Sequence, residues 1–490
     1  AVHYRAQENG VSTGRWPDGA PSMARLSGRS FGFSNPRIAA GTVVINVLMA
    51  HPISGEDDDQ FVELHNRSGS PVDVSGWTFT DGITFDIPAN TTLAAGGYLV
   101  VARNRERLLS RYPGLAPSQV VGDFGGRLSH GSERVALAMP DEIVEVVGRV
   151  AITNQVDIDV DEVTYTLGGR WGQWVDGGGS SLELIDPRAD RRLAPNWADS
   201  DESAKAPWTL VEATGVMDHG MNAGRGNPDR FEMFLQGAGE CLVDEVECRQ
   251  NGGANRISNP GLDGNDNGWT MQGTHHRSQR TTSDAYSGAG SLLISASGRG
   301  DTGSNRIRTS ISTLATEETA TLRARARWLK GNPYLLLRVR GNWIEAAGEL
   351  SVPANLGTPG AINSRWTAHA PPAVVEVGHA PAQPAAGEPV RVSARVDDPD
   401  GVAHVTLTYR LDPGTGTTSL TMRDDGSGGD VRAGDGIYAA QIPGQAQDAM
   451  VAFSLQAEDG GGSSARFPDH ADSAEGLIQF GTTTPAGSLG

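Results

Sequence analysis

Residues 43–101 constrain the fold more than any other stretch of the chain. Three runs within it alternate apolar and polar residues or are nearly all apolar: Val43–Val47, Phe61–Leu64 and Tyr98–Val101. These runs are rich in β-branched and aromatic residues, and clusters of Gly, Pro, Asn, Asp and Ser separate them. Such a pattern is typical of strands joined by turns. We therefore expect an all-β unit here.

The same stretch resembles the lamin-tail domain family. The similar segments are Ile45–Asn46, Phe61–Asn66, Val72–Trp77, Ile87–Pro88 and Leu93–Tyr98. The resemblance implies a small immunoglobulin-like β-sandwich that serves as a scaffold without a catalytic site of its own. It also implies a context, because bacterial members occur in large secreted proteins beside carbohydrate-binding modules, nucleases or a spore-coat-type kinase.

Two later segments resemble other β-sandwich modules. Asn255–Leu262, followed by Gly268-Trp269, is similar to the opening of a galactose-binding-like jelly roll, a fold that is commonly carbohydrate-binding. Asp397–Val402 and Asp424–Tyr438 resemble extracellular immunoglobulin-like modules of bacterial surface proteins. Between these two modules, His369–Pro384 is rich in Pro and Ala, which is typical of a linker.

Together these segments predict β-sandwiches in series. The 64 glycines and 27 prolines come in short bursts between apolar runs, as turn-rich all-β architecture requires. The expected units are a C-terminal remnant of a preceding lamin-tail-like domain (1–42), a lamin-tail domain (43–200), a galactose-binding-like jelly roll (201–363), a linker (364–384), an immunoglobulin-like domain (385–480) and a tail (481–490).

The first 42 residues have two interpretations. They contain too few apolar residues for a core of their own, and Gly14–Gly19 is echoed later at Gly169–Trp171 and Asp176–Gly178. This echo indicates the closing strand and exit loop of a preceding copy of the domain. The alternative is an ordinary N-terminal arm that packs on its neighbour.

Composition limits the partners of the chain. With 40 Lys+Arg against 59 Asp+Glu, the net charge is −19, and an acidic surface repels phosphate backbones, so we expect no nucleic-acid partner. No apolar run approaches the ~18 residues of a transmembrane helix, so we expect no membrane span. Cys241 and Cys248 are expected to be buried as small hydrophobic residues rather than joined in a disulfide.

Two acidic groups are candidates for Ca²⁺, the one cofactor the sequence suggests. Ca²⁺ takes about six to eight oxygen ligands from flexible loops, and carboxylates among glycines can supply them. The alternative is a solvated turn in which Asp side chains bond backbone N–H groups. The candidate ligands are Asp57, Asp58 and Asp59 in the first group, and Asp424, Asp425, Asp430 and Asp435 in the second.

The expected jelly roll contains candidates for carbohydrate contact. Sugar rings stack on exposed aromatic side chains, while His and Arg side chains bond the hydroxyl groups. For each candidate the alternative is a place in the core or on an inert surface. The candidates are His275, His276, Arg277, Trp328, Tyr334 and Trp343.

Enzyme signatures are scarce. The sequence lacks a Gly-x-x-x-x-Gly-Lys-Ser/Thr loop, a His-Glu-x-x-His helix, a Gly-x-Ser-x-Gly elbow and a Cys-x-x-Cys pair. We therefore expect a non-catalytic section of a secreted or cell-surface bacterial protein, for adhesion or display, with a carbohydrate or cell-surface polymer as partner. Two alternatives remain open. One is a subunit that self-associates head to tail into an extracellular filament, and the other is a set of accessory domains of a secreted enzyme whose catalytic domain lies outside these residues.

Overall fold

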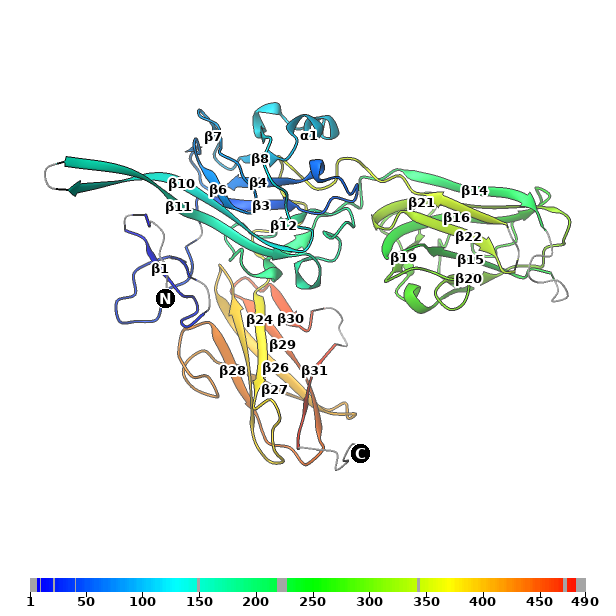
Figure 1. Cartoon of the computed structure of the whole chain (residues 1–490). Helices are drawn as coiled ribbons and strands as arrows, with labels where there is room; N and C mark the ends of the chain where they lie inside the picture. Colours follow the sequence, from blue (N-terminus) through cyan, green and yellow to red (C-terminus); the bar gives the residue numbers. More distant parts are fainter. Residues whose placement is uncertain are drawn as a thin grey trace, which may run out of the picture.

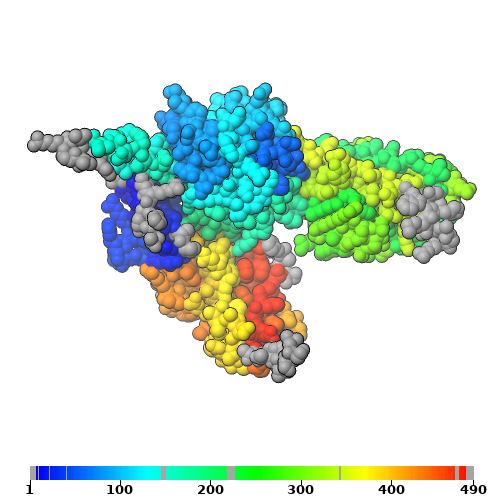
Figure 2. Space-filling model, viewed as in Figure 1, coloured from blue at the N-terminus to red at the C-terminus, as the bar shows by residue number. Residues whose placement is uncertain are grey.

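The computed structural model describes residues 7–8, 10–20, 23–39, 41–147, 150–217, 227–341, 344–469 and 474–481. Over these residues the chain is nearly all β, and α1 (Arg105–Arg111) is the single α-helix among them. Three β-sandwich units form the molecule, and the first of them lies at the centre with the other two docked on it (Figures 1 and 2). The expected all-β series of sandwiches is confirmed.

The central unit is built on a six-stranded sheet in the order β13-β12-β3-β4-β8-β9. A three-stranded sheet, β11-β10-β6, and the short pair β5-β7 accompany it. The strands predicted from residues 43–101 all form, and Asn104 caps α1 by accepting a hydrogen bond from the backbone N–H of Arg107 at 3.0 Å. The strands are β3 (Val43–Met49), β4 (Phe61–Asn66), β5 (Val72–Asp73), β6 (Thr78–Asp81), β7 (Thr92–Leu93), β8 (Tyr98–Ala102), β9 (Val120–Gly122), β10 (Ser132–Val147), β11 (Val150–Thr166), β12 (Leu182–Leu184) and β13 (Trp197–Asp199).

Both faces of the six-stranded sheet are buried, so all seven residues of β3 are inaccessible. One face packs inside the central sandwich. The other is covered by residues 353–366, which return from the second unit and are called the strap below. Polar side chains on this face bond the strap: Glu63 accepts from the backbone N–H of Gly360 at 2.5 Å, and Glu183 accepts from Ser364 at 2.7 Å.

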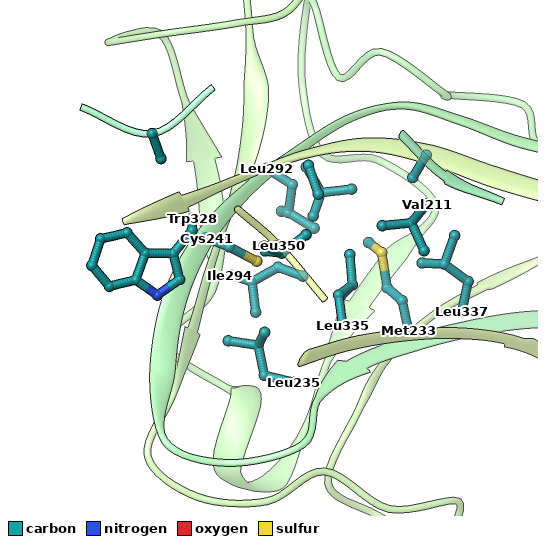
Figure 3. Packing of buried hydrophobic residues seen from close by; sticks show 14 of the residues in the cluster. Val211, Met233, Leu235, Cys241, Leu292, Ile294, Trp328, Leu335, Leu337 and Leu350 are labelled. Carbon is teal, nitrogen blue, oxygen red and sulfur yellow. The ribbon is translucent and has the colours of Figure 1, made fainter. Parts of the chain in front are cut away.

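The second unit consists of two five-stranded antiparallel sheets that face each other. Figure 3 shows the core between them, in which Cys241, Ile294 and Leu335 pack together. Cys241 and Cys248 are both free and buried on β16, as expected. One sheet contains β14 (Trp208–Val216), β21 (Thr319–Gly331), β16 (Gly239–Gln250), β19 (Ser291–Ala296) and β18 (Gln279–Thr281); the other contains β17 (Trp269–Met271), β20 (Ile307–Ser310), β15 (Arg230–Leu235), β22 (Tyr334–Val339) and β23 (Glu345–Glu349).

The third unit pairs a three-stranded sheet with a larger one. The linker expected at 364–384 is wrong over its second half, because Ala373–Ala380 forms β24 and pairs with β25. Ala373 and Val374 of this strand are both buried, so burial outweighs the Pro and Ala content that indicated a linker. The smaller sheet contains β24, β25 (Val390–Asp397) and β28 (Ile437–Ile442); the larger contains β26 (Val402–Asp412), β27 (Thr417–Thr421), β29 (Met450–Asp459), β30 (Ser464–Phe467) and β31 (Gly476–Gln479). Beyond Gly481 the expected tail lies outside the described residues.

The N-terminal segment packs as an arm between the central and third units. Its strands β1 (Ser12–Gly14) and β2 (Ala24–Leu26) pair with each other in a sheet of their own. Arg37 donates two hydrogen bonds to Asp397, at 3.0 and 3.1 Å, and Arg432 forms an ion pair with Asp18 at 2.7 Å. These contacts agree with the alternative of an arm, while descent from a preceding domain copy stays a prediction.

Candidate functional site

The second unit has an open groove of about 920 Å³ on the outer side of the sheet that ends in β22 and β23. Because side chains alternate along a strand, Leu335, Leu337 and Val339 point into the core of the unit. Tyr334 and Arg338 on the opposite side therefore line the groove, and Tyr334 is 46% exposed. The other lining residues include Arg299, Asp301, Leu336, Glu345, Ala347 and Glu349.

A buried carboxylate holds the arginine of this groove. Glu232 on β15 is inaccessible, and its carboxylate lies 3.1 Å from Arg306 Nη1 and 3.6 Å from Arg338 Nε. Burial raises the pKa of Glu232, while the surrounding arginines lower it. Arg338 Nη1 also lies 3.4 Å from Glu345. The guanidinium of Arg338 thus lies between two carboxylates at the edge of the groove.

The tyrosine has an acidic neighbour. A hydrogen bond between the Tyr334 hydroxyl and Glu349, together with the charge of that carboxylate, raises the pKa of Tyr334. The groove therefore combines an exposed aromatic ring with donors and acceptors of both signs, which is the chemistry that binds hydroxyl-rich ligands.

The predicted carbohydrate contact is wrong for two residues, because their side chains are buried. Trp328 is inaccessible, since it occupies an inward position of β21, and its Nε1 donates to the carbonyl of Gly331 at 2.9 Å. His275 is also inaccessible; its Nε2 accepts from the backbone N–H of Leu235 at 3.0 Å, and burial lowers its pKa to about 4. Both side chains are structural, and no sugar can reach them.

The other predicted contacts have different outcomes. Tyr334 lies in the groove, as described above. His276 and Arg277 are exposed, but they are not among the described residues that line the groove. Trp343 lies outside the described residues.

The prediction of Ca²⁺ for the first acidic group is corrected, because basic side chains of the same chain pair with its carboxylates. Asp59 lies 2.6 Å from Arg107 Nε and 2.9 Å from Arg111 Nε. Asp58 is 3.5 Å from Arg103, and Asp57 is 3.1 Å from the imidazole of His130. Each of the three carboxylates has a basic partner, and among the described residues none of their oxygens is buried without one. The group therefore ties α1 and neighbouring loops together instead of gathering around a metal ion.

The second predicted Ca²⁺ group is partly assembled. One carboxylate oxygen each from Asp424, Asp430 and Asp435 lies within 4.8 Å of the others. Asp425 is not part of this group, because it pairs with Arg423 at 3.2 Å and accepts from the Ser427 hydroxyl at 2.6 Å.

Backbone groups account for much of this cluster. Asp424 accepts from the N–H groups of Asp435 and Gly436 at 3.0 Å each, and Asp430 accepts from that of Gly426 at 2.6 Å. Carboxylates that bond backbone N–H groups are what a self-supporting turn requires. The carboxylate oxygens of this loop are ligands that suit Ca²⁺, and Ca²⁺ binding here stays a prediction.

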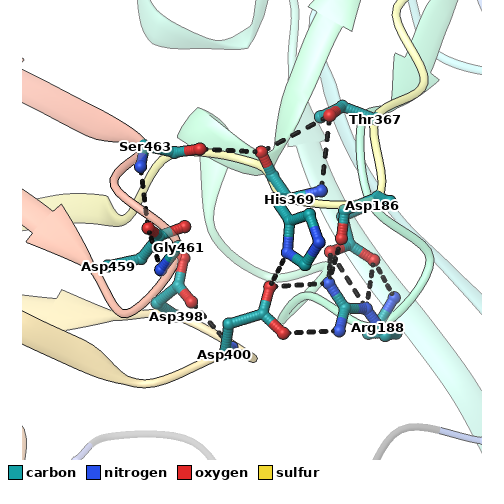
Figure 4. A network of polar contacts seen from close by, with 10 residues as sticks. Asp186, Arg188, Thr367, His369, Asp398, Asp400, Asp459, Gly461 and Ser463 are labelled. Carbon is teal, nitrogen blue, oxygen red and sulfur yellow. Dashed lines mark hydrogen bonds and ion pairs between the residues drawn. The ribbon is translucent and has the colours of Figure 1, made fainter.

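The sequence analysis missed another carboxylate cluster, formed by Asp398, Asp400 and Asp459 (Figure 4). Asp398 and Asp400 precede β26, whereas Asp459 ends β29. The register that pairs Val402 with Asp459 brings the two segments together. The Asp-Asp-Pro-Asp-Gly run was the available signal, but its distant partner could be found only from strand pairing.

Among the described residues, no helix is long and apolar enough to cross a bilayer. The fold defines a modular all-β protein with an immunoglobulin-like sandwich at its centre. The family model described as LTD: Lamin Tail Domain matches residues 36–166, which confirms the resemblance within the central unit. A comparison with curated proteins gave no match.

Proposed function

We propose that the chain is a non-catalytic section of a secreted or cell-surface bacterial protein, used for display and attachment. In this proposal the lamin-tail domain is a rigid hub, the second unit is a carbohydrate-binding jelly roll and the third is an immunoglobulin-like spacer. The observation that carries the proposal is the groove around Tyr334.

Several properties of the groove favour a carbohydrate. The exposed ring of Tyr334 offers an apolar face for the C–H side of a sugar, and its hydroxyl lies beside Glu349. Arg338 and Asp301 add a donor and an acceptor at the same surface. Because the groove is open and contains charges of both signs, a polysaccharide that is neutral or carries both charge signs fits it better than a small anion.

A glycan array with the full chain tests this proposal. Wild-type protein is expected to bind a subset of glycans, and Tyr334→Ala to bind them at least about tenfold more weakly, as loss of a central aromatic contact usually does. Tyr286→Ala is the matched control, because Tyr286 is 42% exposed but packs against Trp208, on a strand of the other sheet. Absence of binding across a broad array would refute the carbohydrate role.

A second candidate function, assembly into a filament, is favoured by the hairpin of β10 and β11. This hairpin projects from the body of the molecule (Figures 1 and 2), and β10 pairs with β6 only through Ala136–Ala138. Ile143, Val144 and Ile152 on its outer part are 43%, 58% and 43% exposed. Open strand edges next to apolar side chains suit pairing with another copy.

A further inference from the structure

The cluster of Asp398, Asp400 and Asp459 lies where the third unit meets the central unit. One carboxylate oxygen from each residue lies within 4.8 Å of the others. Asp400 accepts hydrogen bonds from Arg188 of the central unit, at 2.6 and 2.8 Å, and from His369 Nδ1 at 3.0 Å (Figure 4). The cluster therefore belongs to the joint between units and not to an isolated surface loop.

Two oxygens of the cluster are buried without a partner among the described residues. Asp398 is 3% exposed and Asp459 is 1% exposed. Oδ1 of Asp398 accepts from the N–H of Asp400 at 2.7 Å, and Oδ1 of Asp459 accepts from Gly461 and Ser463 at 2.8 Å each. Over the part of the chain that the structure describes, Oδ2 of both carboxylates has no hydrogen-bond partner. Burying such an atom unpaired is costly, and the cost is greater for a charged group.

The basic side chains that bond Asp400 do not reach the two unpartnered oxygens. Arg188 divides its hydrogen bonds between Asp400 and Asp186, and neither it nor His369 bonds the two unpartnered oxygens. Two buried carboxylates of the cluster thus each keep one oxygen without a hydrogen-bond partner among the described residues. This distinguishes the cluster from the Asp424 loop, where none of the carboxylate oxygens is a buried atom without a partner among the described residues.

We propose that Asp398, Asp400 and Asp459 bind a divalent cation of the Ca²⁺ type at the joint between the central and third units. All three ligands are carboxylate oxygens on loops or at a strand end, which suits a hard cation with a large and flexible coordination shell. Zn²⁺ prefers nitrogen and sulfur ligands, and the imidazole at this site is already bonded to Asp400. Since Asp400 also holds Arg188, the bound ion stabilises the docking of the third unit.

Calorimetric titration of the EDTA-treated full chain with CaCl₂ tests this proposal. Wild type is expected to bind one more equivalent of Ca²⁺ than Asp459→Asn or Asp398→Asn. The amide oxygen of Asn can still accept the backbone hydrogen bonds of Oδ1, so both variants are expected to fold. Asp424→Asn, in the other carboxylate cluster, is the control that must keep this binding event.

Thermal unfolding separates metal binding from a structural role. Ca²⁺ is expected to raise the Tm of wild type, whereas Asp459→Asn, which removes one of two repelling charges, is expected to equal or exceed wild type in EDTA and to lose most of the Ca²⁺-induced shift. Equal Ca²⁺ binding and equal shifts in wild type and both variants would overturn the proposal. So would stabilisation of wild type by mild acid but not by Ca²⁺, because two carboxylates that share a proton would behave that way.

Discussion

Glu63 shows how a charged residue is accommodated inside the central unit. It is inaccessible, and it accepts hydrogen bonds from Asn46 Nδ2 at 2.8 Å and from the strap at Gly360. Burial raises the pKa of Glu63 to about 8, although these two hydrogen bonds act in the opposite direction. The folded state thus favours the protonated carboxyl group, and the unfolded state does not.

Glu63→Gln is therefore expected to reduce the dependence of stability on pH. The raised pKa means that the contribution of Glu63 is most favourable below its ordinary pKa of 4.5 and is lost as the pH rises toward 8. The free energy of unfolding of wild type should fall relative to the variant across this window, as measured by urea denaturation at several pH values. A constant difference between the two proteins from pH 5 to 8 would contradict the assignment.

Trp328 and Tyr334 should respond in opposite ways to truncation. Trp328→Ala removes a fully buried ring and its hydrogen bond, and is expected to cost about 3–5 kcal/mol of unfolding free energy. Tyr334→Ala, at an exposed position, should change stability by no more than about 0.5 kcal/mol. Denaturant unfolding of both variants measures the difference. Similar losses in the two would mean that Trp328 is not a core residue.

At the scale of elements, the strap explains a strand that is buried on both faces. A strand with one solvated face should alternate, yet β3 is buried along its whole length because residues 353–366 cover the second face. Gly360 fits there because its φ is +79° and a Cβ atom would collide with Leu115. The strap, more than 250 residues further along the sequence, thus completes the burial of β3.

The hairpin of β10 and β11 is the element that bears on self-association. If it pairs with another copy, Val144→Lys should abolish a concentration-dependent increase in mass, because it places a charge on the exposed apolar surface. Sedimentation velocity over a range of concentrations measures this. Val216→Lys is the control, since Val216 is 62% exposed on the second unit. A wild-type chain that stays monomeric at all concentrations would rule the hairpin out as an assembly element.

At the scale of the whole molecule, ion pairs anchor the third unit to the centre. Arg395 lies 3.3 Å from Asp190, and the two side chains are 8% and 6% exposed. Arg188 and Asp400 form a more accessible pair, with 38% and 20% of their side chains exposed. Arg170 adds a hydrogen bond to the carbonyl of Val374 at 2.7 Å. The docking of the third unit thus depends on a buried ion pair and on more accessible polar contacts.

Arg395→Ala is therefore expected to loosen the third unit more than Arg188→Ala. Removing one partner of a buried pair costs up to about 3 kcal/mol, and less here because Arg192 still bonds Asp190 at 3.0 Å, whereas an accessible pair contributes about 1 kcal/mol or less. Hydrogen exchange of amides in β24 and β25 measures the free energy of local opening. Arg423→Ala is the control, because the Arg423–Asp425 pair is exposed on both sides. A larger effect of Arg188→Ala would reverse this ranking of the two contacts.

The sequence by itself determined the properties that depend on neighbouring residues. Strand composition and turn residues predicted β3, β4 and β8. The lamin-tail resemblance, confirmed for residues 36–166, also follows from a continuous pattern. The all-β class was likewise predictable.

Tertiary structure alone decided which side chains face solvent and which carboxylates meet. Alternation along β21 and β22 defines two faces, but only the packing of the sheets buries Trp328 and exposes Tyr334. In the same way, Asp59 meets arginines of α1, whereas Asp398 meets Asp459 through the pairing of β26 with β29. Burial and charge compensation depend on residues far apart in the chain, and a local pattern contains no information about those distances.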